Sequence, residues 1–266
     1  MKLDAYLQRI GYTKSLTPTL DVLRDIAFHH AITIPFENLN PFLGLPVSLE
    51  LADVERKLVD EQRGGYCFEQ NLLLSEALSA IGFQVSGLAA RVLWMQPEDS
   101  ITPRSHRVLL VEAHEHTYVV DVGFGGLTLT GALELVQNIE QATPHELFRL
   151  VPVDDHWRMQ AKLGDSWRTL YRFDLLRQHP IDYKVMNYFT ATHPTSHFVH
   201  DLVAARPTPV GRYALRNREF SFRGIDGTVE SRVLADVNDI RAVLQNEFQI
   251  KLPTVPQLDE RLGSLP

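Results

Sequence analysis

The chain contains a single cysteine, Cys67, within the run Arg-Gly-Gly-Tyr-Cys-Phe-Glu-Gln-Asn at residues 63–71. The two glycines give the backbone the freedom to turn sharply just before the cysteine. Apolar residues then follow at helical spacing until Gly82, a typical stop signal. We therefore expect Cys67 in the first turn of a helix, where unsatisfied amides and the positive end of the helix dipole favour a thiolate nucleophile. A buried, inert cysteine is the alternative.

A base and an orienting carboxylate for such a nucleophile occur in the next part of the chain. Residues 105–111 and 117–123 both have strand character, and a polar turn near residue 115 joins them into a predicted hairpin. In that hairpin His106 and Asp121 are direct or diagonal cross-strand neighbours, with Cβ atoms roughly 5–8 Å apart. With Cys67 they make a candidate catalytic triad. A polar pair that only stabilises the sheet is the alternative.

Hydrophobic periodicity predicts where these side chains are mounted. Residues 1–83 have helical patterns. We expect a first helix ending at Gly11, a second beginning at Pro18 and capped by Thr17, and a third over residues 49–59 capped by Ser48. Residues 84–190 instead contain short alternating or β-branched stretches, typical of a small antiparallel barrel. The predicted strands cover residues 84–93, 107–112, 117–122, 148–153, 157–163 and 166–173.

The last part of the chain, residues 191–266, has mixed character. Strands are predicted at residues 210–215, 219–223 and 228–233, followed by a helix over residues 234–248 and a coil tail. The whole chain is therefore predicted to have an α+β fold.

Composition limits the partners of the protein. With 266 residues, 44% hydrophobic and 22% charged, the chain has the composition of an ordinary globular protein. Its formal net charge of −7 argues against nucleic-acid and membrane-surface binding, which both favour a basic face. One cysteine cannot form an intramolecular disulfide, and neither a signal peptide nor a membrane-spanning stretch is recognisable. We predict a cytoplasmic protein.

The run at residues 63–71 resembles the active-site signature of the arylamine N-acetyltransferases. Four further segments resemble motifs of that family in the same order. They are Pro-Phe-Glu-Asn-Leu at 35–39, Ser-His at 105–106, Val-Asp-Val-Gly-Phe-Gly at 120–125, and Asn-Tyr-Phe-Thr-Ala-Thr-His-Pro-Thr-Ser-His-Phe at 187–198. In the last segment Ala191 stands where the family usually has serine.

The resemblance implies an N-terminal helical bundle (1–83), a central antiparallel β-barrel (84–190) and a C-terminal α/β lid (191–266) around a Cys-His-Asp core like that of cysteine proteases. It also implies a ping-pong reaction with acetyl-CoA as acetyl donor. Cys67 takes the acetyl group, and the nitrogen of an arylamine, arylhydrazine or arylhydroxylamine then accepts it. His106 is the expected proton acceptor, and Asp121 holds its imidazole in the required tautomer.

Three glycines follow the aspartate within the next five residues. Gly123, Gly125 and Gly126 would let the backbone approach a phosphate or the pantetheine arm of CoA closely. An ordinary strand-ending turn is the alternative. The resemblance adds Thr192 and Ser196 as candidate contacts to the cofactor.

Three phenylalanines, Phe36, Phe124 and Phe198, each lie inside one of the motifs. We predict that they wall an apolar pocket beside Cys67, which would suit a flat aromatic amine and exclude water. Core packing is the alternative for each of them. No metal site is predicted, because Pro194 interrupts the histidine-rich stretch and no carboxylate or thiol completes a ligand set.

Glu37 and Glu69 are expected to be structural, pairing with Arg63 or capping amides. Two other functions stay open. A cysteine hydrolase uses the same triad, and a CoA- or ligand-binding module could carry an inert cysteine. The full run at residues 63–71 and the predicted apolar pocket favour the transferase.

Overall fold

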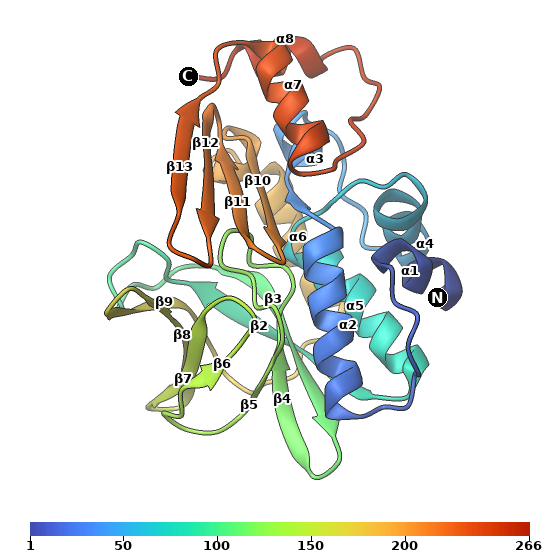
Figure 1. The fold of residues 1–266 in the computed structure, drawn as a ribbon, viewed down its shortest axis with the longest axis vertical. Coiled ribbons are helices and arrows are strands. Elements are labelled where there is room, and N and C mark those ends of the chain that lie inside the picture. Colours follow the sequence, from blue (N-terminus) through green and yellow to red (C-terminus); the bar gives the residue numbers. More distant parts are fainter.

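The computed structural model describes residues 1–266 and contains one antiparallel sheet of eight strands and one of five, with helices beside them (Figure 1). This arrangement confirms the predicted α+β fold. The N-terminal helices pack around a core of 24 buried residues. The helical segments are α1 (Leu3–Ile10), α2 (Leu20–Thr33), α3 (Leu39–Phe42), α4 (Leu51–Glu55), the π-helical turn η1 (Arg56–Asp60) and α5 (Cys67–Ile81).

Helix ends follow local signals, with two corrections. Gly11 (φ 67°) and Gly82 (φ 114°) end α1 and α5 in the left-handed conformation, as predicted. The predicted cap of α2 is wrong, because the hydroxyl of Thr19, not Thr17, accepts the amide of Val22 and α2 starts at residue 20. Ser48 does not cap α4 either. Its hydroxyl donates to a carboxylate oxygen of Asp53, 2.7 Å away.

The central strands are β2 (Gln84–Val92), β3 (Arg104–Ala113), β4 (His116–Val120), β5 (Ala132–Glu134), β6 (Gln141–Ala142), β7 (Leu147–Val153), β8 (His156–Leu163) and β9 (Ser166–Phe173). They pair in the order β5-β4-β3-β2-β9-β8-β7-β6 and curl into a nearly closed barrel around 14 buried residues (Figure 1). The six predicted strands are all present, with ends shifted by a few residues.

A helix in this region was not predicted. α6 (Pro180–Thr192) contacts β3, α3 and the short turn η2 (His197–Val199). Pro180 occupies its first turn, and the Asp182 carboxylate accepts the amide of His179 at 2.8 Å. The predicted domain boundary at residue 190 falls inside this helix.

The smaller sheet combines one strand from the N-terminal part of the chain with four strands from its C-terminal part. Its strands are β1 (Phe36–Glu37), β10 (Val203–Thr208), β11 (Gly211–Arg216), β12 (Glu219–Gly224) and β13 (Val229–Val233), paired in that order. β1 and β10 were not predicted. β1 pairs with β10 through Phe36 and Ala205, so this five-stranded sheet holds the segment that precedes the cysteine loop.

Two helices, α7 (Val237–Asn246) and α8 (Leu258–Gly263), complete the hydrophobic core of this sheet (Figure 1). α7 starts three residues later than predicted, because the carboxylate of Asp236 caps the amides of Asn238 and Asp239. The coil predicted for the tail is wrong at α8, where Leu258 and Leu262 are buried against the core.

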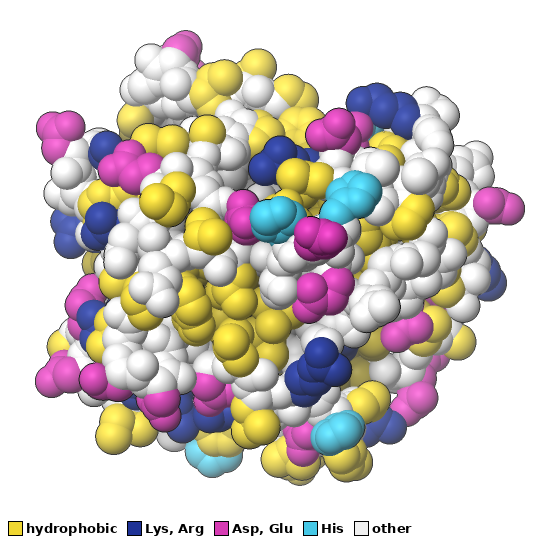
Figure 2. All heavy atoms as spheres, turned by 90° about the horizontal axis from the view of Figure 1, so that it is seen from below, with side chains coloured by type: hydrophobic (Ala, Val, Ile, Leu, Met, Phe, Trp, Pro, Cys, Tyr) yellow, Lys and Arg dark blue, Asp and Glu magenta, His cyan; other side chains and the backbone are white.

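No helix of the structure is both long and apolar enough to cross a membrane. Figure 2 views the molecule from the barrel end, where acidic and basic side chains are interspersed around a central group of hydrophobic ones.

Candidate active site

Cys67 is the first residue of α5, and its side chain is buried, with 4% of its surface exposed. The turn before it is tight. A side chain at Gly64 would overlap the carbonyl oxygen of Pro35, and a Cβ at Gly65 would lie 2.7 Å from a carboxylate oxygen of Glu69. The run therefore needs both glycines to pass between the N-terminal segment and α5.

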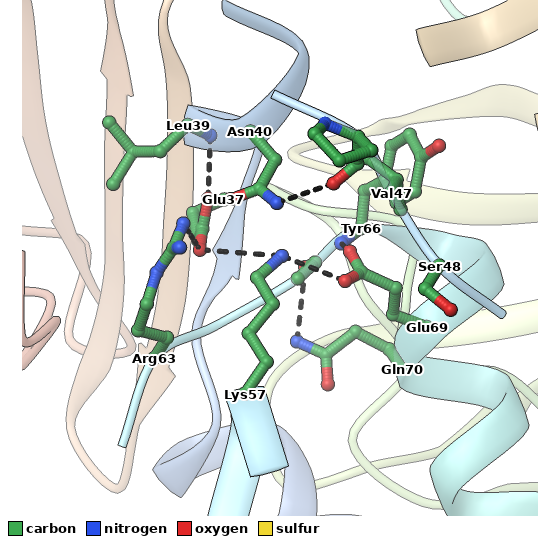
Figure 3. Close-up of polar contacts among 12 residues, drawn as sticks. Glu37, Leu39, Asn40, Val47, Ser48, Lys57, Arg63, Tyr66, Glu69 and Gln70 are labelled. Carbon is green, nitrogen blue, oxygen red and sulfur yellow. Dashed lines mark hydrogen bonds and ion pairs between the residues drawn. The ribbon is translucent and has the colours of Figure 1, made fainter. Parts of the chain in front are cut away.

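A buried cluster of charges holds this turn: Glu37, Lys57, Arg63 and Glu69 (Figure 3). Arg63 Nη2 lies 2.8 Å from Glu37 Oε1, and Lys57 Nζ lies 2.7 Å from Glu69 Oε1 and 3.7 Å from Glu37 Oε1. Glu69 also accepts the amide of Tyr66 at 3.2 Å, directly before the cysteine. The structural interpretation of both glutamates is confirmed, whereas Lys57, in η1, was not foreseen.

The two carboxyl groups in this cluster have opposite pKa shifts. Burial raises the pKa of Glu37, but Arg63 and Lys57 outweigh burial and leave that pKa below its usual value. For Glu69 burial dominates over the single cation Lys57, and its pKa is raised.

Replacing Lys57 by methionine removes the only cation that contacts Glu69. We expect the free energy of unfolding to fall by about 3 kcal/mol at pH 7, as for a broken buried ion pair. The unpaired carboxyl has a folded-state pKa above its unfolded value, so its penalty is full above the folded-state pKa and fades as the pH falls through that pKa toward about 5. Urea unfolding at both pH values measures this difference.

Lys2→Met is the matched control, because the Lys2–Asp60 ion pair is exposed and is expected to contribute under about 1 kcal/mol. An unchanged stability of Lys57→Met, or a loss independent of pH, would contradict the role given to this cation.

The barrel supplies the other two members of the predicted triad. His106 lies on β3, and Asp121 follows directly after β4. Because Leu109 pairs with Val120, Asp121 is the diagonal neighbour of His106. His106 Nε2 lies 2.7 Å from Asp121 Oδ2, and both side chains are buried.

His106 approaches Cys67 at the N-terminal end of α5. The thiol of Cys67 donates to the carbonyl of Ser105 at 3.5 Å, next to His106 in the chain. Burial alone would lower the pKa of His106, but the charge and hydrogen bond of Asp121, with a contribution from Cys67, raise it well above its usual value. Burial likewise opposes ionisation of Asp121, yet His106, the Asn71 amide and the Gly123 amide leave its pKa lowered. The pair is therefore charged at neutral pH.

Asn71 was not among the predicted site residues. Its amide donates to Asp121 Oδ1 at 2.9 Å and to the Arg107 carbonyl at 2.7 Å, and its oxygen accepts the Val122 amide at 3.1 Å. It lies one helical turn after Cys67, so α5 carries both the cysteine and a group that fixes the carboxylate. The signal was its i+4 spacing from the cysteine.

Tyr171 was also missed. Its ring centroid lies 4.9 Å from that of His106, and its buried hydroxyl has no hydrogen-bond partner. It reaches the site from β9, so no local sequence pattern connects it to the triad.

The predicted cofactor residues are three glycines that follow Asp121 and two hydroxyl residues near the C-terminal end of α6. A Cβ at Gly123 would lie 2.6 Å from Cys67 Cα, so this glycine permits close packing of the aspartate loop on α5. A Cβ at Gly125 (φ +81°) would lie 3.7 Å from the ring of Phe36, whereas nothing lies within 4 Å of one at Gly126. The hydroxyls of Thr192 and Ser196 both donate to carbonyls of α6, those of Tyr188 and Thr190.

The three phenylalanines lie on two sides of the triad. Phe36 and Phe198 pack with their ring centroids 6.0 Å apart, in the same apolar cluster as Cys67. Phe124 instead packs on His106, with ring centroids 5.3 Å apart, and against the barrel core.

Comparison with known proteins gives the family. The family model for N-acetyltransferases matches residues 19–256. The arylamine N-acetyltransferase of Escherichia coli K12 is 40% identical over 247 residues, covering 92% of this chain and 88% of that protein. That of Mycobacterium tuberculosis H37Rv is 40% identical over 272 residues, covering 100% and 96%. The structure of Mycobacterium marinum arylamine N-acetyltransferase in complex with CoA matches with a TM-score of 0.95 at 39% identity, covering 99% of both chains.

The fold, the position of the lone cysteine and these similarities define an acyltransferase. The chain belongs to the arylamine N-acetyltransferase family, and the resemblance seen in its motifs is thereby confirmed.

Proposed function

We propose that this enzyme transfers the acetyl group of acetyl-CoA to the nitrogen of arylamines, arylhydrazines or arylhydroxylamines through an acetyl-Cys67 intermediate. The observation that carries the proposal is the placement of Cys67 at the start of α5, beside the charged pair of His106 and Asp121. The similar proteins support the substrate class, since they are arylamine N-acetyltransferases and the structure of one was solved in complex with CoA. The lone cysteine suits a reducing compartment, and we propose the cytoplasm.

In the first half-reaction the thiolate of Cys67 attacks the thioester carbonyl of acetyl-CoA. The new C–S bond forms, the bond to the CoA sulfur breaks, and the imidazolium of His106 gives its proton to the leaving thiolate. Backbone amides at the start of α5 are suited to stabilise the oxyanion. His106 is left neutral and ready to act as a base.

In the second half-reaction the nitrogen of the amine attacks the acetyl carbon. Neutral His106 takes the proton of the amine, the bond to the Cys67 sulfur breaks, and the thiolate–imidazolium pair returns. Asp121 stabilises the positive imidazole throughout. We propose that Phe36, Phe124 and Phe198 contact the aromatic ring of the acceptor, because they flank the sulfur and the imidazole.

We propose that the acetyl donor runs past Gly125 and Gly126, since the backbone at Gly126 borders open space. Gly123 would support this donor site by letting the aspartate loop approach Cys67 closely. Thr192 and Ser196 would support it through their hydrogen bonds to backbone carbonyls of α6, which stabilise the end of that helix.

Initial rates measured against both substrates test the two-step scheme. We expect parallel double-reciprocal lines when acetyl-CoA is varied at several fixed concentrations of an aromatic amine, as a covalent intermediate requires. Converging lines would instead indicate direct transfer within a ternary complex.

Asn71→Ala tests the link between α5 and the carboxylate. It removes one hydrogen bond to a charged group, so we expect kcat to fall about 10- to 100-fold. Asn246→Ala, at the exposed end of α7, should keep the kcat of the unmodified protein. A normal kcat for Asn71→Ala would show that the Asp121 position does not depend on this amide.

A further inference from the structure

Four arginines lie side by side across neighbouring strands of the barrel. Arg104 on β3 pairs with Arg91 on β2, Arg91 pairs with Arg172 on β9, and Arg172 pairs with Arg158 on β8. Directly paired residues project from the same face of a sheet. We call these four residues the arginine row.

The register makes the row possible through an irregularity. Ala90 pairs with His106, yet the next residue, Arg91, pairs with Arg104, so Ser105 is an extra residue in β3. This bulge places Arg104 and His106 on opposite faces of the sheet although only one residue separates them. The row therefore begins beside the candidate active site, on the outer face of the barrel.

Carboxylates neutralise only the two ends of the row. Arg104 pairs with Asp174, and Arg158 pairs with Glu98. Arg91 donates to the backbone carbonyl of Thr102.

The half-buried side chain of Arg172 forms no hydrogen bond or ion pair, although its backbone is paired on both sides in the sheet. Like charges placed directly opposite each other in a sheet destabilise it. The pKa of Arg91 is lowered, first by burial and then by the charges of Arg104 and Arg172. The middle of the row thus carries positive charge that no ion pair neutralises.

A cavity of about 280 Å³ lies over this part of the row, lined by Arg91, Arg104 and Arg172 together with Ala89, Asp155, His156, Phe173 and Asp174. Neither of its two carboxylates forms an ion pair with the central arginines. Asp174 pairs with Arg104 and acts on Arg91 only through its charge, and the side chain of Asp155 is 98% exposed. The Nε2 atom of His156 is buried without a partner, which adds an unused polar group.

We propose that the arginine row binds a phosphate or pyrophosphate group in this cavity. Guanidinium groups donate paired hydrogen bonds that match phosphate oxygens, and several such groups in register match a group with more than one charge. An anion between the central arginines would also relieve their mutual repulsion. The phosphates could belong to the CoA part of the acetyl donor, which rests on the proposed function, or to free phosphate.

Calorimetric titration with sodium pyrophosphate at constant ionic strength tests the site. Arg172→Gln removes a central charge without removing any hydrogen bond, and Arg168→Gln is the matched control on the exposed part of β9. We expect the unmodified protein and Arg168→Gln to bind equally, and Arg172→Gln to bind about tenfold more weakly. Equal affinity in all three proteins, or no saturable binding, would overturn the proposal.

Steady-state kinetics then distinguish the two sources. A several-fold higher KM of Arg172→Gln for acetyl-CoA, with an unchanged KM for phosphate-free S-acetyl-pantetheine, assigns the row to the acetyl donor. Unchanged KM values for both donors, together with weakened pyrophosphate binding, assign it to free phosphate. Acetylation of Cys67 by p-nitrophenyl acetate involves no phosphate, so failure of that reaction would count against the proposed function and not against the row.

Discussion

We expect the replacement of Cys67 by serine to abolish acetyl transfer and to leave the fold intact. The hydroxyl is not ionised at neutral pH and is a poorer nucleophile toward a thioester than a thiolate. We expect kcat to fall by at least about ten-thousand-fold, the scale found when a covalent nucleophile is removed. The substitution keeps a donor for the Ser105 carbonyl, so stability should hardly change.

Turnover with acetyl-CoA and an aromatic amine measures the effect, and thermal unfolding of the same preparation is the control. Transfer at more than about a hundredth of the normal rate by a folded Cys67→Ser protein would rule out the covalent intermediate.

We expect Asp121→Asn to lower kcat about as much as Cys67→Ser does, and the hydrogen bonds of the carboxylate give the reason. Oδ1 of Asp121 accepts from the amides of Asn71 and Gly123, so the oxygen of the introduced asparagine must occupy that position. Its NH₂ group then faces His106 Nε2 and makes that nitrogen an acceptor. The proton moves to the nitrogen that faces Cys67, which is the wrong tautomer for a base, and a loss near ten-thousand-fold in kcat follows.

The same variant should change the pH dependence of Cys67 reactivity. Asp121 is the main group that holds the pKa of His106 above its usual value, whereas burial acts to lower it. Without the carboxylate the imidazole is neutral at pH 7, and the thiolate loses its cationic partner. Alkylation of Cys67 by iodoacetamide should therefore require a higher pH.

Asp165→Asn, in an exposed turn, serves as the matched control for both measurements. An Asp121→Asn protein with near-normal kcat and an unchanged alkylation profile would refute the role of the carboxylate.

Local signals in the sequence were sufficient for much of the fold. Gly11 and Gly82 end their helices because a left-handed residue is needed there, and the strands from residue 147 to 173 follow alternation and turns. β1 was missed because two residues carry no periodic signal and their partner, at Ala205, lies far along the chain. α6 was missed because the motif at residues 187–198 indicates a function and not a helix, and the helix begins seven residues before that motif.

The site residues also divide into those that local signals place and those that only tertiary packing brings together. His106 and Asp121 could be paired in advance because a hairpin fixes their relative position. Lys57 and Tyr171 could not, since each reaches its partner from a separate element through tertiary packing. The arginine row depends on a bulge at Ser105 and on the pairing of β2 with β9. No local sequence pattern predicts either feature.

The acetyl-Cys67 intermediate is the central claim, and intact mass spectrometry tests it most directly. The protein is mixed with acetyl-CoA and no amine, with Cys67→Ser as the control. We expect one added acetyl group, absent from the variant, that an aromatic amine removes quickly and water removes slowly. CoA release with no acetylated protein would indicate a hydrolase, and neither adduct nor CoA release would contradict catalysis by this cysteine.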